Sequence, residues 1–302
     1  ETVINSATFL AIENPSTDVA RYRAGDLDMT SYALPPEQFA KLQKELPGEV
    51  FTTRTLATYS YELNNKKAPF DNVNIRKALN LSLDRHVITD KVLGQGQTPT
   101  YVFTPTYIEE GHLIQQPAYS KEPMAQRNEE AIKLLEEAGY SKANPLKFSI
   151  LYNTNENHKK VAIAAASMWK VNTKGLIDVK LENQEWKTYI DSRRAGRYDA
   201  ARAGWNADYN QATTFGNYFL SNSSNNTAKY TNPEYDKAIA ESYVATDAEG
   251  RAKAYAKAEE ILAKDYGIVP IFNYVNPRLV KPYVKGYSGK DPQDHILSLI
   301  HI

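Results

Sequence analysis

The chain has 302 residues, with 36 Lys and Arg against 36 Asp and Glu, so its formal net charge at pH 7 is zero. A chain of this length has room for about two domains, and its even charge gives no overall attraction to nucleic acid or anionic membranes. The absence of cysteine excludes thiolate catalysis, iron–sulfur ligation and zinc sites that need cysteine. No apolar run reaches the roughly 18 residues of a membrane span. We therefore expect no nucleic-acid partner and a function that depends on a local site.

The first 63 residues alternate strand and helix signals. Ser16, Thr17 and Asp18 are residue types that cap helices, and Pro35 suits a first helical turn because its φ is already fixed. The run after the second helix is rich in Thr and Tyr, as strands are, and could pass from one lobe into another. The predicted elements are a strand at 2–10, a helix at 16–22, a strand at 26–30, a helix at 36–46 and a strand at 51–63.

The remainder of the chain predicts an α/β layer, because strand and helix signals keep alternating. Asp71 or Asn72 can cap a helix with one apolar stripe. A capping box of Thr246 and Glu249 predicts the start of the last helix. Helices are expected at 72–83, 128–138, 157–171, 186–195, 233–244 and 247–264, strands at 146–152, 176–182, 268–274 and 278–284, and long loops at 94–116 and 209–233.

The segment at 198–210, Tyr-Asp-Ala-Ala-Arg-Ala-Gly-Trp-Asn-Ala-Asp-Tyr-Asn, has the strongest signal for a binding site. Small residues around Gly204 indicate a strand whose backbone another molecule can approach closely. Arg202, Trp205 and Asp208 place a cation, a ring and a carboxylate within seven residues, which together could hold a small zwitterionic chain. A buried strand end with a structural Arg–Asp ion pair explains the same pattern equally well.

The sequence lacks the common catalytic and metal-binding motifs. The five histidines show no helical i, i+4 pair and no His-Glu-x-x-His motif, so a zinc site is not expected. Gly94 and Gly96 follow a helix and lack the third glycine of a dinucleotide-binding loop. His158 could face a cleft from a helix start, although a surface histidine is the simpler interpretation. We therefore expect no cofactor, no metal and no enzymatic activity.

Several segments together resemble one protein family. They lie at 70–85, 134–140, 183–188, 201–210 and 274–282, and they are similar to segments of the large peptide-binding proteins of ABC importers, the family 5 extracellular solute-binding proteins. The resemblance extends over residues 1–295. It implies a two-lobed α/β fold of the periplasmic-binding-protein (type II) class that closes on an extended peptide. Compared with the family, the N-terminal part of the first lobe and a small extra lobe are missing.

The resemblance also implies a role for individual residues. Asp208 would hold the peptide amino group, and Gly204 to Asn206 would supply backbone pairing. Asn206 stands where relatives tend to have cysteine, and Leu93 stands where they can carry a lysine. The side chains of Arg193, Arg202 and His158 would bind the carboxylates of peptides of different lengths. Pockets would be lined by three aromatic residues, Trp186, Trp205 and Tyr274.

The function implied is that of a monomeric receptor in the periplasm of a Gram-negative bacterium, which binds short peptides and delivers them to the membrane permease subunits of an ABC importer. One alternative is a same-family receptor for a dipeptide, a murein peptide, haem or nickel. Another is an enzyme, a peptidase or glycosidase, that uses Asp199 and Asp208. The predicted division is a partial first lobe at 1–56, the far, peptide-binding lobe at 57–275, a return to the first lobe at 276–296 and a non-native tail at 297–302.

Overall fold

The computed structural model describes residues 5–12, 14–30 and 33–292, which form one six-stranded sheet of order β2-β6-β1-β5-β3-β4. The strands are β1 (Val50–Leu63), β2 (Thr98–Pro99), β3 (Leu146–Asn153), β4 (Ile177–Gln184), β5 (Ala200–Asn206) and β6 (Ile268–Leu279). The α-helices are α1 (Pro15–Ala24), α2 (Pro36–Glu45), α3 (Val73–Leu81), α4 (Met124–Glu137), α5 (Glu156–Asn172), α6 (Trp186–Arg194), α7 (Thr213–Gly216), α8 (Pro233–Val244) and α9 (Ala248–Lys264). The described ranges also contain one π-helix, η1 (Val87–Leu93), and two 3-10 helices, η2 (Ala118–Lys121) and η3 (Asn217–Phe219). None of the helices in these ranges is long and apolar enough to cross a membrane.

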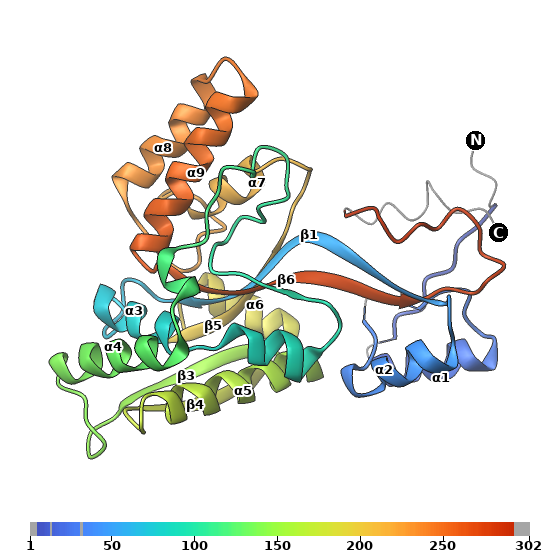
Figure 1. Ribbon diagram of the computed structural model, residues 1–302, viewed down its shortest axis with the longest axis horizontal. Coiled ribbons are helices and arrows are strands. Elements are labelled where there is room, and N and C mark those ends of the chain that lie inside the picture. Colours follow the sequence, from blue (N-terminus) through green and yellow to red (C-terminus); the bar gives the residue numbers. More distant parts are fainter. Residues whose placement is uncertain (1–4, 13, 31–32, 293–302) are drawn as a thin grey trace.

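The sheet lies between two helical layers (Figure 1). Helices α3, α4 and α5 cover one face, where Trp169 is fully buried against Tyr61 and Phe148. The antiparallel pair α8 and α9 rises from the other face together with α7. Because side chains alternate along β1, Tyr61 points to the first layer while Glu62 contacts Tyr218 of η3 on the opposite side.

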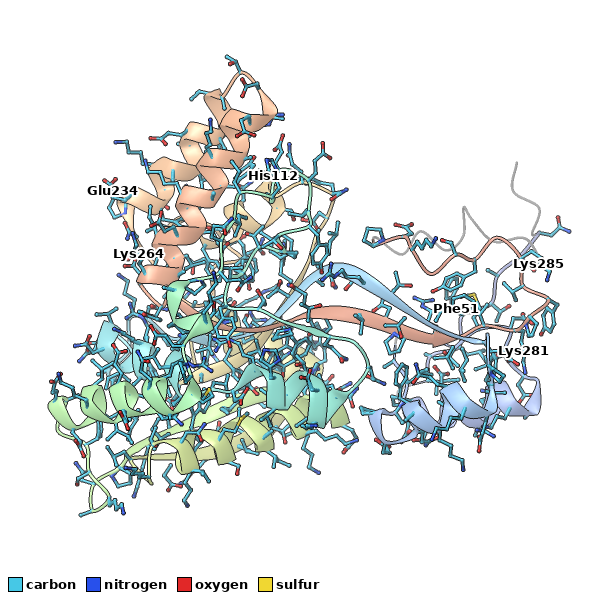
Figure 2. The ribbon with its side chains drawn as sticks, viewed as in Figure 1. Phe51, His112, Glu234, Lys264, Lys281 and Lys285 are labelled. Atoms are coloured by element: carbon cyan, nitrogen blue, oxygen red, sulfur yellow. The ribbon has the colours of Figure 1, made fainter. Side chains whose placement is uncertain are left out.

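Strands β1 and β6 continue beyond the sheet as a two-stranded ribbon that leads to α1 and α2 (Figure 1). Figure 2 labels Phe51 and Lys281 at the far end of this ribbon. Between Arg54 and Thr58, the register of β1 shifts against β6, whose Tyr274 lies alone opposite three residues. A bulge of this kind bends a strand and interrupts its ladder, and this one lies where the ribbon leaves the body.

Helix caps decide several element boundaries. Asn72 caps α3, as one of the two predicted alternatives, by accepting a hydrogen bond from the Asn74 backbone N–H. The predicted caps of α1 and α9 are wrong. Asn14 caps α1 in place of the three residues predicted, and Asp247 replaces the Thr246 capping box because its carboxylate accepts from the Gly250 N–H at 2.7 Å. In each case an adjacent Asx side chain satisfies the first free N–H groups.

Three predicted strands differ in the structure. Residues 5–10 of the first one form no strand, because none of the described residues pairs with them. The strand expected at 26–30 is reduced to one bridge, Met29 to Val280. Of the strand expected at 278–284, Arg278 and Leu279 form the end of β6, which continues through Pro277 because β6 is an edge strand there. Residues 281–284 form no strand. Helices η1 and α7 were not predicted, and the proposed tail at 297–302 lies outside the described residues.

Candidate functional site

A cavity of about 620 Å³ lies where the ribbon leaves the body, against β1, β5, β6 and the first turns of α5 and α6. Its wall contains both polar and apolar residues. Leu93 at the end of η1 and Pro277 of the ribbon are two of the apolar ones. Six of the nine predicted site residues line it, and these are His158, Trp186, Arg202, Gly204, Asn206 and Tyr274.

Arg202 is the cation of this cavity wall. Its guanidinium donates to the Tyr274 hydroxyl at 2.5 Å and to Asn153 Oδ1 at 3.5 Å, and it lies 5.3 Å from the ring centroid of Tyr59. None of the ion pairs among residues 5–12, 14–30 and 33–292 involves Arg202. A half-buried cation without a carboxylate partner favours an anionic ligand at this wall.

His158 stands beside Arg202 at the start of α5. Its ring centroid lies 5.6 Å from that of Tyr59. Burial, and then the positive charge of Arg202, hold the pKa of His158 well below its ordinary value. The imidazole is therefore neutral at neutral pH and can donate or accept a hydrogen bond.

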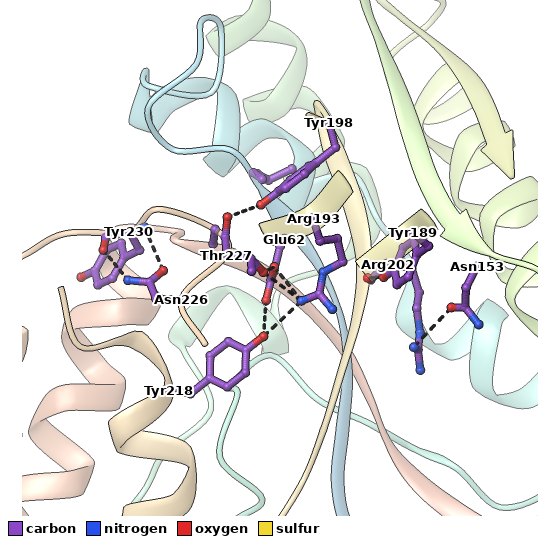
Figure 3. Close-up of polar contacts among 12 residues, drawn as sticks. Glu62, Asn153, Tyr189, Arg193, Tyr198, Arg202, Tyr218, Asn226, Thr227 and Tyr230 are labelled. Carbon is purple, nitrogen blue, oxygen red and sulfur yellow. Dashed lines mark hydrogen bonds and ion pairs between the residues drawn. The ribbon is translucent and has the colours of Figure 1, made fainter. Parts of the chain in front are cut away.

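Strand β5 has an open edge at the cavity. Beyond Ala201, no described strand pairs with the side of β5 that faces β3. The Ala207 N–H donates to the Leu56 carbonyl, so by antiparallel alternation Arg202, Gly204 and Asn206 turn their main-chain groups away from β1. The Arg202 carbonyl accepts from the Tyr189 hydroxyl (Figure 3).

Gly204 keeps this edge accessible and leaves room for Arg202. A Cβ at position 204 would lie 2.8 Å from Arg202 Nη2 and 2.9 Å from the Tyr274 hydroxyl. The absence of a side chain therefore lets the guanidinium cross the strand beside Tyr274, and it lets a ligand approach the backbone.

Three predicted site residues lie outside the cavity lining. Arg193 donates to Glu62 at 2.9 Å, behind β5 (Figure 3). Trp205 packs its ring against Tyr218 at a centroid distance of 4.9 Å. Asp208 is exposed just after β5. Their predicted contacts with a peptide stay predictions.

The structure weakens two alternatives that the sequence left open. Arg202 and Asp208 form no ion pair within the described ranges, so the pattern at 198–210 is not a structural Arg–Asp pair. Asp199 precedes β5 and bonds Lys67 at 2.6 Å and the Ser149 N–H at 3.0 Å, whereas Asp208 follows the strand. A seven-residue strand places its two ends roughly 20 Å apart, beyond the separation at which paired carboxylates cleave glycosides.

Sequence reasoning missed several residues of this region. Tyr59 and Asn157 line the cavity, and Gln95 joins it from the loop after η1, donating to the Leu34 carbonyl at 2.7 Å. Glu62 was the one that carried a signal, because Glu is depleted in strands and a buried carboxylate is unusual unless paired. Among the described residues, no group of His, Cys, Asp and Glu is arranged to hold a metal ion.

Comparisons with known proteins identify the family of the chain. A family model described as bacterial extracellular solute-binding proteins, family 5 Middle, matches residues 2–227. The periplasmic oligopeptide-binding protein OppA of Haemophilus influenzae is 96% identical over 296 residues, which cover 98% of this chain and 55% of that protein. The periplasmic murein peptide-binding protein MppA of Escherichia coli is 43% identical over 294 residues, which cover 97% of this chain and 54% of that protein.

Solved structures match over nearly the whole chain. The crystal structure of Haemophilus influenzae OppA in complex with RPPGFSPFR has a TM-score of 0.95 at 94% identity and covers 100% of this chain and 59% of that one. The Escherichia coli murein tripeptide binding protein MppA has a TM-score of 0.90 at 42% identity, covering 97% of this chain and 57% of that one. These matches confirm the predicted α/β fold class, the two-lobed periplasmic-binding-protein (type II) fold. The chain spans about half the length of the curated relatives it matches. Since the family model covers most of its residues, the chain belongs to the bacterial extracellular solute-binding proteins, family 5.

Proposed function

We propose that the chain carries the main recognition surface of a monomeric periplasmic receptor, which binds short peptides in an extended conformation for uptake by an ABC importer. The observation that carries the proposal is the open edge of β5 beside the cavity. An extended peptide can add to such an edge through main-chain hydrogen bonds, which are independent of side-chain identity. The receptor performs no chemistry on its ligand, and its partners are the peptide and the permease subunits.

The charges around β5 predict the direction of the peptide. Asp208 lies beyond the C-terminal end of β5, while Arg202 lies in its N-terminal half and has His158 near its guanidinium. A peptide with its amino group at Asp208 and its carboxylate near Arg202 would therefore run antiparallel to β5. Gly204 and Asn206 would supply the central main-chain hydrogen bonds.

Two named relatives support a peptide as the ligand. The Haemophilus influenzae structure holds the peptide RPPGFSPFR, and MppA of Escherichia coli is named for murein tripeptide binding. Both relatives are named binding proteins, and the curated counterparts are named periplasmic.

The test measures Asp208→Asn against two versions of one short peptide, with a free and with an acetylated amino group. NMR titration suits the measurement because it detects weak as well as tight binding. We expect the substitution to lower affinity for the free-amine peptide by at least about tenfold, because a charge-assisted hydrogen bond is lost. Binding of the acetylated peptide should change much less.

The matched control is Asp199→Asn, which changes a carboxylate at the other end of β5 that is already bonded to Lys67 and Ser149. It should leave the ratio between the two peptides unchanged. If the effects of Asp208→Asn and of acetylation prove additive, Asp208 does not contact the amine.

A further inference from the structure

We propose that Thr214, a residue of α7 outside the cavity lining, positions the carboxylate of Asp208 and the indole of Trp205, and so sets the preference for ligands with a free amino group. The inference rests on the proposed function, because it gives Asp208 the role of amine anchor. Thr214 itself does not touch the ligand in this scheme. It is a positioning residue.

The hydroxyl of Thr214 uses its whole hydrogen-bonding capacity on these two residues. It accepts from Trp205 Nε1 at 3.3 Å and from the Asp208 backbone N–H at 3.2 Å, and it donates to Asp208 Oδ2 at 3.3 Å. A threonine hydroxyl has one hydrogen to donate and two lone pairs, so none of its capacity is left over. One buried oxygen thereby fixes the indole, the backbone and the carboxylate at the end of β5.

This contact matters for Asp208 because the carboxylate is otherwise exposed. Within residues 5–12, 14–30 and 33–292, the Thr214 hydroxyl is the one hydrogen-bond partner of the Asp208 side chain. An exposed carboxylate samples several rotamers, and holding it in one of them lowers the entropy lost when a ligand ammonium binds.

Helix α7 is a firm support for Thr214. A Cβ at Gly216 would lie 2.7 Å from Ile239 Cδ1, so α7 packs directly on α8. The Tyr235 hydroxyl donates to the Gly216 carbonyl at 2.7 Å. Thr214 is only 4% exposed. The hydroxyl is thus held in place by packing against the helical layer of α8 and α9.

The indole of Trp205 is held from its other side as well. Its ring meets the ring of Tyr218 edge-on, and the Tyr218 hydroxyl donates to Glu62 at 2.6 Å (Figure 3). Arg193 donates to the same Tyr218 oxygen at 3.1 Å. The buried Glu62 and Arg193 pair therefore anchors the ring against which Trp205 packs, while Thr214 anchors its N–H.

The experiment compares Thr214→Val, which keeps the shape and removes the hydroxyl, with Thr214→Ser, which keeps the hydroxyl, in the 302-residue chain. Thr173→Val is the matched control, because it removes an equally buried hydroxyl that donates instead to the Trp169 carbonyl. The probes are tetra-alanine with a free amino group and its N-acetylated form. The second readout is the indole N–H signal of Trp205 in the ¹H–¹⁵N spectrum, which Trp205→Phe identifies.

Thr214→Val should reduce the preference for the free-amine peptide about tenfold, the effect expected when one hydrogen bond to a charged group is lost. It should also move the Trp205 indole signal, while Thr214→Ser and Thr173→Val keep the preference. If Thr214→Val does not fold, as judged by circular dichroism, Thr214→Ala supplies a second variant without the hydroxyl.

A hydroxyl-free variant that keeps both the free-amine preference and the Trp205 signal overturns the role of Thr214 while leaving the proposed function intact. Failure of the proposed function is visible in the unmodified chain, which would then show no preference for the free amine. That outcome also overturns the claim that Thr214 sets such a preference.

Discussion

Arg193 Nη2 lies 2.9 Å from Glu62 Oε2, and the two side chains are only 10% and 1% exposed. Thr227 and Tyr218 complete the hydrogen bonds around this buried ion pair (Figure 3). Arg193 therefore already has a carboxylate partner. Arg202, on the opposite side of β5, has none among the described residues. The structure thus places the two arginines in different surroundings, although the sequence suggests the same role for both.

The first prediction concerns this pair. Arg193→Met should lower the free energy of unfolding by about 3–5 kcal/mol, because Glu62 is left as an uncompensated buried charge. Urea denaturation measures the loss. The double variant Glu62→Leu with Arg193→Met should lose much less than the sum of the two single variants, since removing both charges removes the unpaired one. Additive losses would show that the two side chains are not energetically coupled.

The second prediction is that Gly204→Ala acts through Arg202. The new methyl group would approach Arg202 Nη2 to 2.8 Å, so the guanidinium must leave Tyr274. Affinity for a peptide with a free carboxylate should fall by roughly tenfold, and affinity for the C-terminally amidated peptide should fall less. Isothermal titration or NMR gives both values.

Arg202→Gln is the comparison variant for that experiment, because it removes the cation without adding volume to β5. Both variants should lose the higher affinity for the peptide with a free carboxylate over the amidated peptide. If Gly204→Ala keeps the preference for the free carboxylate while Arg202→Gln loses it, the methyl group at position 204 does not displace the guanidinium and the prediction is wrong.

The third prediction concerns pH. The pKa of His158 lies well below its ordinary value because of burial and then Arg202, whereas in the unfolded chain it is about 6.5. The unfolded state therefore binds more protons, and the stability that neutral His158 contributes is present above about pH 6.5 and lost as the pH falls toward the folded-state pKa. Melting temperatures between pH 7 and pH 5 should fall less steeply for His158→Gln than for the unmodified chain.

Glu37 and Asp199 do not account for the same window, and Glu259, whose pKa is raised by burial, changes stability in the opposite direction. The pKa values of Glu37 and Asp199 are lowered, the first mainly by its bond to Lys160 and the second by Lys67 and Ser149 against the effect of burial. Their contributions to stability are lost only below about pH 4.5. Equal slopes for the two proteins between pH 7 and pH 5 would contradict a neutral His158 with a lowered pKa.

The fourth prediction concerns the two ends of the ribbon. Helices α1 and α2 pack around a small apolar cluster with Leu279. Contacts of this region with the body, within the described ranges, include Lys160 to Glu37 at 2.7 Å and Gln95 to the Leu34 carbonyl. Segments with a small apolar core open more readily, and the Lys160–Glu37 pair is exposed to solvent. Hydrogen exchange should therefore be much faster in α1 and α2 than in β3. Equal protection in both parts would contradict the prediction.

The sequence by itself determined most of the local structure. Apolar periodicity and capping residues predict α3, α5, α8 and β3 to within a few residues, because these signals depend on near neighbours in the chain. The small residues of β5 and the charges around them are also neighbours in sequence, so they mark a candidate binding segment in the same local way.

Only the tertiary structure decided which partners the charged side chains contact. Glu62 and Arg193 are 131 residues apart in the chain, and Arg202 and Tyr274 are 72 apart, so no local pattern reports either contact. The order β1-β5-β3 brings Glu62 behind β5 and leaves the far half of that strand unpaired beside the cavity. Whether an arginine is free for a ligand depends on what the fold packs against it, and that is a property of the sheet order and the helical layers, not of the residue or its neighbours in sequence.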